Sequence, residues 1–148
     1  MGFKTLIEGV NADLQDLYAV CADEINKRGI PNLEFDWRKE IRFGLGLFSG
    51  EKESALVLIA KDERHQGEVF AYSFGPNLYV ETTAFWINAY EVDLAKEGNN
   101  WRHLDEVWTS CFMSLLDSAV RDALKRYLEK VQAPVPEGLT AKDVFIVD

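Results

Sequence analysis

The segment VWTSCFMSLLDSAVRDALKRYL, residues 107–128, places its apolar residues in pairs and repeats the pair every four positions. An α-helix turns by about 100° per residue, so each step of four carries the pair about 40° around the helix axis. From Val107 to Tyr127 the apolar seam therefore rotates through roughly 200°. Because a sheet covers only one side of a helix, the two halves of this helix need different neighbours.

Three arrangements satisfy this rotation. The helix can kink near Asp117 and Ser118, or its N-terminal half can cover a sheet while its C-terminal half packs on another helix. In the third arrangement the C-terminal half faces a second copy of the chain, and the partner-binding residues are Val120, Leu124 and Tyr127. A helix over 101–131 would be about 46 Å long, whereas a compact domain of this size is about 40 Å across, which keeps the homodimer open.

The N-terminal part of the chain carries a second helical pattern. The stretch Thr5–Glu8 matches a capping box, in which a threonine side chain and a glutamate three residues later bond the free backbone amides of a helix start. Apolar residues then recur with helical spacing as far as position 25, and Gly29 and Pro31 follow as stop signals. The sequence therefore predicts a helix over residues 6–28.

Between the two helical patterns the apolar residues alternate with period two. The clearest case is 33–47, where apolar side chains occupy most odd positions and polar residues or glycines most even positions, with a turn or bulge expected near 38–39. Further strands are expected over 55–60, 69–74, 78–82 and 85–94. The short turns between them favour an antiparallel meander.

The order of these segments predicts one α+β domain over residues 1–148. Its antiparallel sheet has five to six strands and is flanked by an N-terminal helix and a long C-terminal helix. Residues 132–148 form a linker, rich in proline, and a short terminal strand at 144–147. In the homodimer arrangement this terminal strand is exchanged between copies.

The charge of the chain limits its partners. The formal net charge is −9, which repels a phosphate backbone and suits a basic protein partner. The basic cluster at the end of the long helix is typical of a helix C-terminus and does not predict nucleic-acid binding. No apolar run approaches the roughly 18 residues of a membrane span, and no secretory signal is recognisable, so we expect a cytoplasmic protein with no membrane partner.

No motif of catalysis or cofactor binding stands out. His103 and Glu106 share a helical face, but two residues do not complete a metal site, and a solvated helix start explains them as well. The two cysteines, Cys21 and Cys111, form no zinc signature, and we expect both to be small buried hydrophobes. We therefore expect no catalytic residues, no metal and no cofactor.

Two functions remain open on these grounds. The first is a non-catalytic protein-binding domain of chaperone, adaptor or inhibitor type, which should expose an apolar patch of several hundred Å². The alternative is a small-ligand-binding protein or enzyme with a cavity of roughly 300 Å³ or more. That aromatic pocket would lie between the curved sheet and the long helix, lined by Phe43, Tyr72, Trp86 and Trp108.

Overall fold

The computed structural model describes the backbone of residues 2–43, 52–86 and 99–139, and the side chains of residues 2–40, 54–85 and 106–139. In these ranges, five strands form one antiparallel sheet in the order β1-β5-β4-β3-β2, with an N-terminal helix and a long C-terminal helix, which confirms the α+β prediction. The elements along the chain are β1 (Lys4–Ile7), α1 (Leu14–Lys27), β2 (Glu34–Phe43), β3 (Lys52–Lys61), β4 (His65–Phe74), β5 (Asn77–Trp86), α3 (Asn99–Lys130) and the 3-10 turn η2 (Glu137–Leu139).

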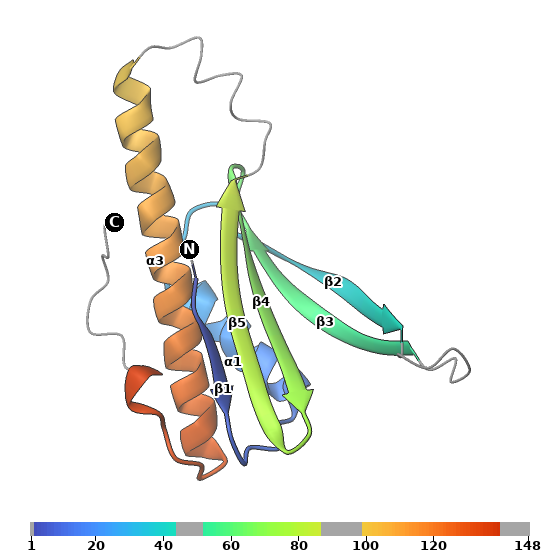
Figure 1. Ribbon diagram of the computed structural model, residues 1–148. Coiled ribbons are helices and arrows are strands. Elements are labelled where there is room, and N and C mark those ends of the chain that lie inside the picture. Colours follow the sequence, from blue (N-terminus) through green and yellow to red (C-terminus); the bar gives the residue numbers. More distant parts are fainter. Residues whose placement is uncertain (1, 44–51, 87–98, 140–148) are drawn as a thin grey trace.

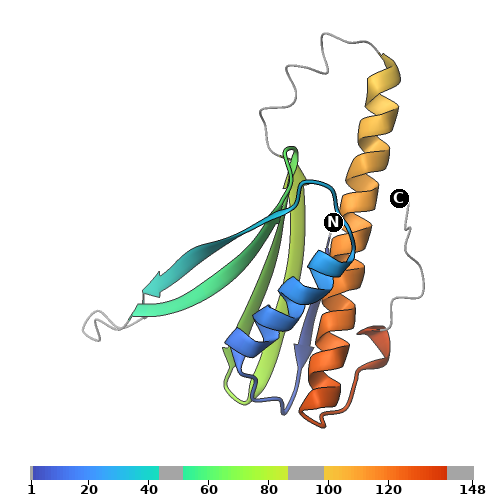
Figure 2. The same cartoon turned by 180° about the vertical axis from the view of Figure 1, so that it is seen from behind.

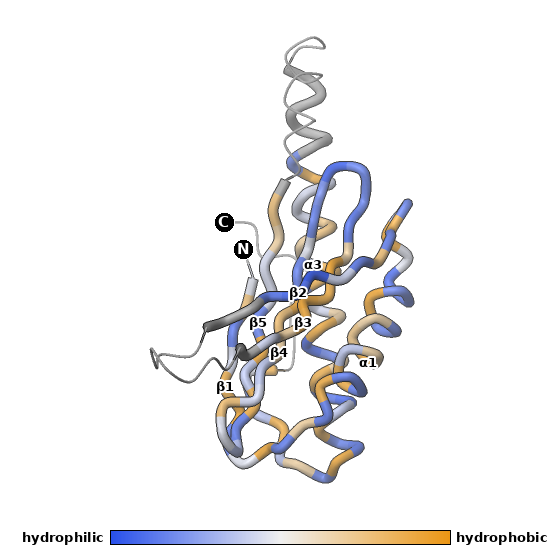
Figure 3. The backbone as a smooth tube through the Cα atoms, turned by 90° about the vertical axis from the view of Figure 1, so that its right-hand side faces the viewer, coloured by the Kyte–Doolittle hydropathy of each residue, from blue (hydrophilic) through white to orange (hydrophobic). Residues whose placement is uncertain are grey.

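Both helices lie on the same face of the sheet. Figure 2 looks onto α1 (blue) and α3 (orange) with the strands behind them, and the side view in Figure 3 shows α1 to one side of the strands. The core lies between these two layers, and it includes Leu58, Val69 and Val80 from the strands together with Leu17 from α1 and Leu124 from α3. Within the described ranges, the other face of the sheet carries no helix, and we call it the helix-free face.

The long helix α3 is continuous, without a break at Asp117 or Ser118. In its middle part, Phe112 stacks on His65 of β4, and Leu116 packs against Gly67 of the same strand. The C-terminal part packs on α1 instead. The rotating apolar seam therefore corresponds to the second of the three arrangements.

Val120, Leu124 and Tyr127 are buried where α3 meets α1, with exposed fractions of 0%, 0% and 2%. The Tyr127 hydroxyl also accepts a hydrogen bond of 2.9 Å from the backbone amide of Asp13, just before α1. Helix α1 of the same chain thus covers the face of α3 for which the sequence also allowed contact with a second copy. These three residues are part of the core.

Charged side chains also join the two helices. Arg126 of α3 donates to Asp23 at 2.9 Å and to Glu24 at 2.6 Å, and Lys130 bonds Asp16 at 2.9 Å. Much of the basic cluster predicted at the end of the long helix is therefore neutralised by the acidic side chains of α1. This agrees with a structural role and leaves little positive surface there.

The N-terminus differs from the prediction. Lys4–Ile7 is a strand, β1, which pairs antiparallel with Leu78–Glu81 of β5, so the predicted helix start at residue 6 is wrong. The helix begins at Leu14, where the Asp13 side chain accepts hydrogen bonds from the amides of Gln15 and Asp16. The capping-box pattern in Thr5–Glu8 was outweighed by sheet hydrogen bonds that come from a distant part of the chain.

The turn or bulge expected near 38–39 is wrong: β2 runs from Glu34 to Phe43 and pairs with β3 without interruption. The other strands overlap the segments that the alternation predicted, and β3, β4 and β5 have longer bounds. The segment predicted over 85–94 overlaps the end of β5 at Phe85 and Trp86, and its other residues lie outside the described part of the chain. The terminal strand predicted at 144–147 lies outside it as well. Strands β2 to β5 form the predicted meander, and β1 adds to its far edge.

The sheet divides between β3 and β4. Strands β2 and β3 pair over ten residues, and so do β4 and β5, but β3 and β4 pair only from Val57–Phe70 to Lys61–Gln66. Beyond that point the β2–β3 hairpin diverges from β4 (Figure 1). We call the place where this pairing stops the β3–β4 fork.

Candidate functional site

Tyr18 of α1 occupies the β3–β4 fork. The pairing of Val57 with Phe70 makes Leu56 and Ala71 the next partners along the ladder, but these two residues do not pair directly. The Tyr18 hydroxyl lies between them: it donates to the carbonyl of Leu56 and accepts a hydrogen bond of 2.8 Å from the amide of Ala71. A side chain therefore bridges the two strands where their backbone ladder ends.

Burial raises the pKa of Tyr18 to about 12, although the hydrogen bond from Ala71 opposes this rise. The residue is only 3% exposed, so its ionised form would lie in a poorly solvated position. The ring of Trp37 on β2 meets the Tyr18 ring edge-on, with the ring centres 5.5 Å apart. Tyr18 thus connects α1, both strands of the fork and β2.

An apolar surface lies on the helix side of the β2–β3 hairpin. Phe35 and Trp37 point to this side, because Trp37 contacts Tyr18 of α1 and alternate residues of a strand share a face. Leu56 of β3 belongs to the same face, opposite Lys39. The exposed fractions of Phe35, Trp37 and Leu56 are 37%, 50% and 42%. We call these three residues the hairpin patch.

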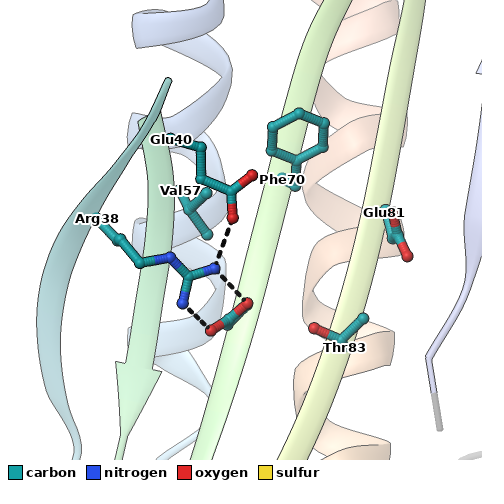
Figure 4. Close-up of a pocket in the computed structure, with 7 residues that line it drawn as sticks. Arg38, Glu40, Val57, Phe70, Glu81 and Thr83 are labelled. Carbon is teal, nitrogen blue, oxygen red and sulfur yellow. Dashed lines mark hydrogen bonds and ion pairs between the residues drawn. The ribbon is translucent and has the colours of Figure 1, made fainter. Parts of the chain in front are cut away.

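A hollow of 210 Å³ lies on the helix-free face, and we call it the acidic pocket. Figure 4 shows Arg38 and Glu40 of β2 on one side of the hollow and Glu81 and Thr83 of β5 on the other. Arg38 binds Glu68 of β4 through both terminal nitrogens, at 2.5 and 2.9 Å. The residues that line the acidic pocket are Arg38, Glu40, Val57, Glu68, Phe70, Glu81 and Thr83.

Ion pairs and hydrogen bonds hold the charged side chains of the acidic pocket in place. Hydrogen bonds from Arg38 lower the pKa of Glu68, against the effect of burial, and Arg38 also donates to Glu40 at 2.8 Å. On the far side, Tyr79 donates to Glu81 at 3.0 Å. The pocket therefore holds three carboxylates and one guanidinium, an arrangement that attracts cations, and it offers no activated nucleophile.

A polar cluster joins the β3–β4 turn to α3. The His65 ring is fully buried; its Nδ1 lies 3.2 Å from both carboxylate oxygens of Asp62, and its Nε2 lies 2.8 Å from the Thr109 hydroxyl. The Trp108 indole donates to Asp62 at 3.1 Å. The guanidinium of Arg64 lies 5.7 Å from the centre of the Trp108 ring.

The carboxylate of Asp62 is the centre of this cluster. Burial alone would raise its pKa, but hydrogen bonds from the backbone amides of Arg64 and His65, from the Trp108 indole and from the His65 ring hold the pKa of Asp62 below its usual value. In a carboxylate–imidazole–hydroxyl arrangement the imidazole can take the proton of the hydroxyl, while the carboxylate orients the ring. Here, however, both His65 and Thr109 are buried, so the cluster serves to fix the turn to α3.

The four residues expected to line an aromatic pocket do not come together. Tyr72 lies on the helix-free face, where its ring stacks on Phe70 with the ring centres 6.2 Å apart. Trp108 lies on α3, on the opposite side of the sheet. The side chains of Phe43 and Trp86 lie outside the described part of the chain.

Sequence reasoning did not single out Tyr18, and it placed neither Trp37 nor Arg38 in a candidate site. Tyr18 and Trp37 were recognised as members of apolar faces, but the pattern of a single strand does not show whether a helix covers it. The alternation of Arg38 and Glu40 on β2 was visible in the sequence. Their position beside Glu68 depends on the register between three strands, which periodicity does not give.

Within the described ranges, no group of three or more His, Cys, Asp or Glu side chains is placed to hold a metal ion. Within those same ranges, no helix combines the length and apolar character required to cross a bilayer.

Comparison with known proteins gives no family. No family model matches the chain, and no curated protein matches it. Among solved structures, the chain is similar to the protein TTHA0849 from Thermus thermophilus, with 13% sequence identity and a TM-score of 0.29. The similarity covers 83% of this chain and 97% of that one.

Proposed function

We propose that this chain is a non-catalytic protein-binding domain of chaperone, adaptor or inhibitor type, and that it binds its partner through the hairpin patch. The observation that carries the proposal is the exposure of Phe35, Trp37 and Leu56 side by side on one face of the hairpin. Neighbouring exposed aromatic and aliphatic side chains are typical of protein interfaces, where tryptophan often contributes most of the binding energy.

The acidic pocket does not have the features that the small-ligand alternative requires. The acidic pocket has a volume of 210 Å³ and lies on the surface of the helix-free face, away from α3. Ligand sites are usually larger, roughly 300 to 1,000 Å³, and mostly apolar. The His65 cluster contains a carboxylate, an imidazole and a hydroxyl, as a catalytic triad does. Because His65 and Thr109 are buried, the cluster offers a substrate little access.

The overall charge and the cysteines refine this proposal. A net charge of −9 favours a partner with basic residues around its contact surface, and disfavours nucleic acid. We further propose a cytoplasmic location, supported by two free cysteines, Cys21 and Cys111, neither of which is in a disulfide.

The proposal is tested by capture of partner proteins with quantitative mass spectrometry. Wild type, Trp37→Ser and a control, Phe74→Ser, are used as bait in the same extract. Phe74 is the matched control because it is 64% exposed and ends β4, away from the hairpin patch. We expect specific partners to be depleted about tenfold or more on Trp37→Ser, since central aromatic residues contribute about 2 kcal/mol or more to interfaces.

The melting temperature of each bait is measured first, because Trp37 also contacts Tyr18. Leu56→Glu is a second variant that alters the patch without touching Trp37. Equal capture of the same partners by wild type, Trp37→Ser and Leu56→Glu would overturn the proposal.

A further inference from the structure

We infer that two copies of this chain pair through the free edge of β2, antiparallel and in a register centred on Lys39, so that their two sheets join into one. This inference goes beyond the proposed function, because it concerns contact of the chain with itself through a strand edge. It also differs from the homodimer that the sequence allowed, which used the long helix. Strand β2 ends the order of the sheet, and Figure 1 shows it as the outer strand of the diverging hairpin.

The directions of the backbone groups along β2 follow from the bridge at the β3–β4 fork. The carbonyl of Leu56 accepts a hydrogen bond from Tyr18 there, so it points from β3 toward β4. Successive residues of an antiparallel strand bond to opposite sides, so Val57 bonds to its partner Arg38 on β2. The even-numbered residues of β2 therefore bond to β3, and the backbone groups of the odd-numbered residues point to the free edge.

The amide of Trp37 agrees with this assignment. It donates a hydrogen bond of 2.8 Å to the side chain of the preceding residue, Asp36, rather than to a carbonyl of β3. Unpaired amides and carbonyls along an edge are a template for another strand. Residues 34–40 are all exposed, so a second strand can reach this edge.

The charges of β2 complement those of a second β2. The alternation of the strand assigns Asp36, Arg38, Glu40 and Arg42 to one face, with both signs among them. In the register centred on Lys39, Arg38 lies opposite Glu40 of the second copy, and Asp36 lies opposite Arg42. Each of these two pairs occurs twice because the arrangement is symmetric. Opposite charges placed directly across two strands stabilise their pairing.

The same charges disfavour the neighbouring registers. Odd-numbered residues must lie opposite odd-numbered ones, because these carry the outward backbone groups. A register centred on Arg38 would place Asp36 opposite Glu40, and a register centred on Glu40 would place Arg38 opposite Arg42. Like charges directly opposite each other destabilise a pair of strands. The charge pattern therefore selects the register centred on Lys39.

The helix side of the joined strands is mainly apolar. The selected register places Ile41 of the second copy opposite Trp37, and Phe43 opposite Phe35. Lys39 meets its own copy at the centre, which is one like-charge pair against the opposite charges on the other face. Apolar and aromatic cross-strand pairs add to the stability of a sheet.

The lengths of the two sheet edges favour a closed dimer. Strand β2 has 10 residues, whereas β1, at the other edge, has 4. Pairing of β2 with β1 of another copy would leave most of β2 unpaired and would extend into an open chain of molecules. Pairing of β2 with itself uses the longer edge twice and closes on a two-fold axis.

The experiment is analytical ultracentrifugation of the full-length chain from low to high micromolar concentration. We expect the mass to rise with concentration from the monomer value of 16.9 kDa toward that of a dimer. A wild type that stays monomeric throughout would overturn the inference and leave this edge to a strand of another protein. The hairpin-patch proposal would stand, because that patch is exposed on a single chain.

Two charge reversals test the register. Asp36→Arg and Arg42→Asp each place like charges opposite each other at both symmetric positions, so each variant should dimerise about tenfold or more weakly than wild type. In an equimolar mixture, one copy of each variant again brings opposite charges together at both positions, and dimerisation should recover. Glu129→Arg is the control, because it changes the net charge as Asp36→Arg does, at an exposed position of α3. Failure of the mixture to recover would overturn the register.

Lys39→Pro tests the backbone pairing itself. Proline is tolerated on edge strands where the lost amide faces solvent, so the single chain should keep its fold, which its circular dichroism and melting temperature report. The change removes the central hydrogen bonds of the dimer, and we expect dimerisation to be lost. A dimer that persists in a folded Lys39→Pro variant, or that is as strong in Asp36→Arg as in wild type, would use another surface and would overturn the inference.

Discussion

Replacement of Tyr18 by phenylalanine isolates the role of a single hydroxyl group. The change keeps the ring, and with it the contact to Trp37, but removes the bridge between Leu56 and Ala71. Ala71 is 1% exposed, so its amide would lose its partner in a place that water does not reach. A buried unsatisfied group costs about 1–3 kcal/mol. With the partly exposed carbonyl of Leu56 added, we expect the free energy of unfolding to fall by about 2–3 kcal/mol.

Urea unfolding at neutral pH measures this loss, and hydrogen exchange locates it. The Ala71 amide should exchange faster, and amides of the hairpin should lose more protection than those of α1 and α3. Tyr79→Phe is the control, because the Tyr79 hydroxyl bonds Glu81 on the partly exposed helix-free face. We expect less than about 0.5 kcal/mol from that change, as for most surface substitutions.

Alkaline pH gives a second measure of the same hydroxyl. The pKa of Tyr18 is raised to about 12 in the folded chain, against 10.0 for an unperturbed tyrosine. A raised pKa means that the contribution to stability is complete below pH 10 and is lost as the pH rises toward 12, by about 3 kcal/mol in total. Tyr18→Phe should remove this loss. A stability difference below about 0.5 kcal/mol at neutral pH, the size of an ordinary surface substitution, would refute the bridging role.

Three further predictions concern other sites. Gly67→Ala should destabilise the chain by about 1–3 kcal/mol in urea unfolding, because an added methyl group would lie 2.3 Å from a buried leucine of α3, while Gly138→Ala, with open space around it, should have little effect. Asp62→Asn should lower stability by about 1–3 kcal/mol at neutral pH; since the pKa of Asp62 is lowered, wild type loses this advantage as the pH falls below about 4, and the two unfolding curves should converge. In thiol labelling, Cys111 should react in the folded chain, whereas Cys21, whose pKa burial raises to about 12, should react only on unfolding; rapid labelling of both would contradict this.

The rotating seam of residues 107–128 limited the surroundings of the long helix to three arrangements, one of which the structure shows. It required two different neighbours for α3, and the structure supplies the sheet for Phe112 and Leu116 and α1 for Val120 and Leu124. Helical periodicity is a local property, so it can be measured from the sequence alone. The alternation in β2 likewise placed Phe35 and Trp37 on one face.

The N-terminal strand and the β3–β4 fork could not be predicted in the same way. The residues of β1 fit a helical stripe as well as a strand, and hydrogen bonds from β5 decided between them. A real helix-start signal was present at Asp13, but the stronger-looking pattern at Thr5 obscured it. The β3–β4 fork depends on where one pairing stops, and no local pattern encodes the position of Tyr18 between two strands.

The pairing of β1 with β5 has a consequence for the time during which the ribosome makes the chain. Lys4 is synthesised well before its sheet partner, Glu81, which emerges only after α1 and β2 to β4. Strands β2 to β5 need only neighbouring segments and can form hairpins as they appear. The N-terminal strand must wait, and α1 acquires its cover from Leu124 and Tyr127 later still, when α3 has emerged. Nascent chains that stop before the second half of α3 would therefore leave α1 with an uncovered apolar face, and we expect such chains to be prone to aggregation.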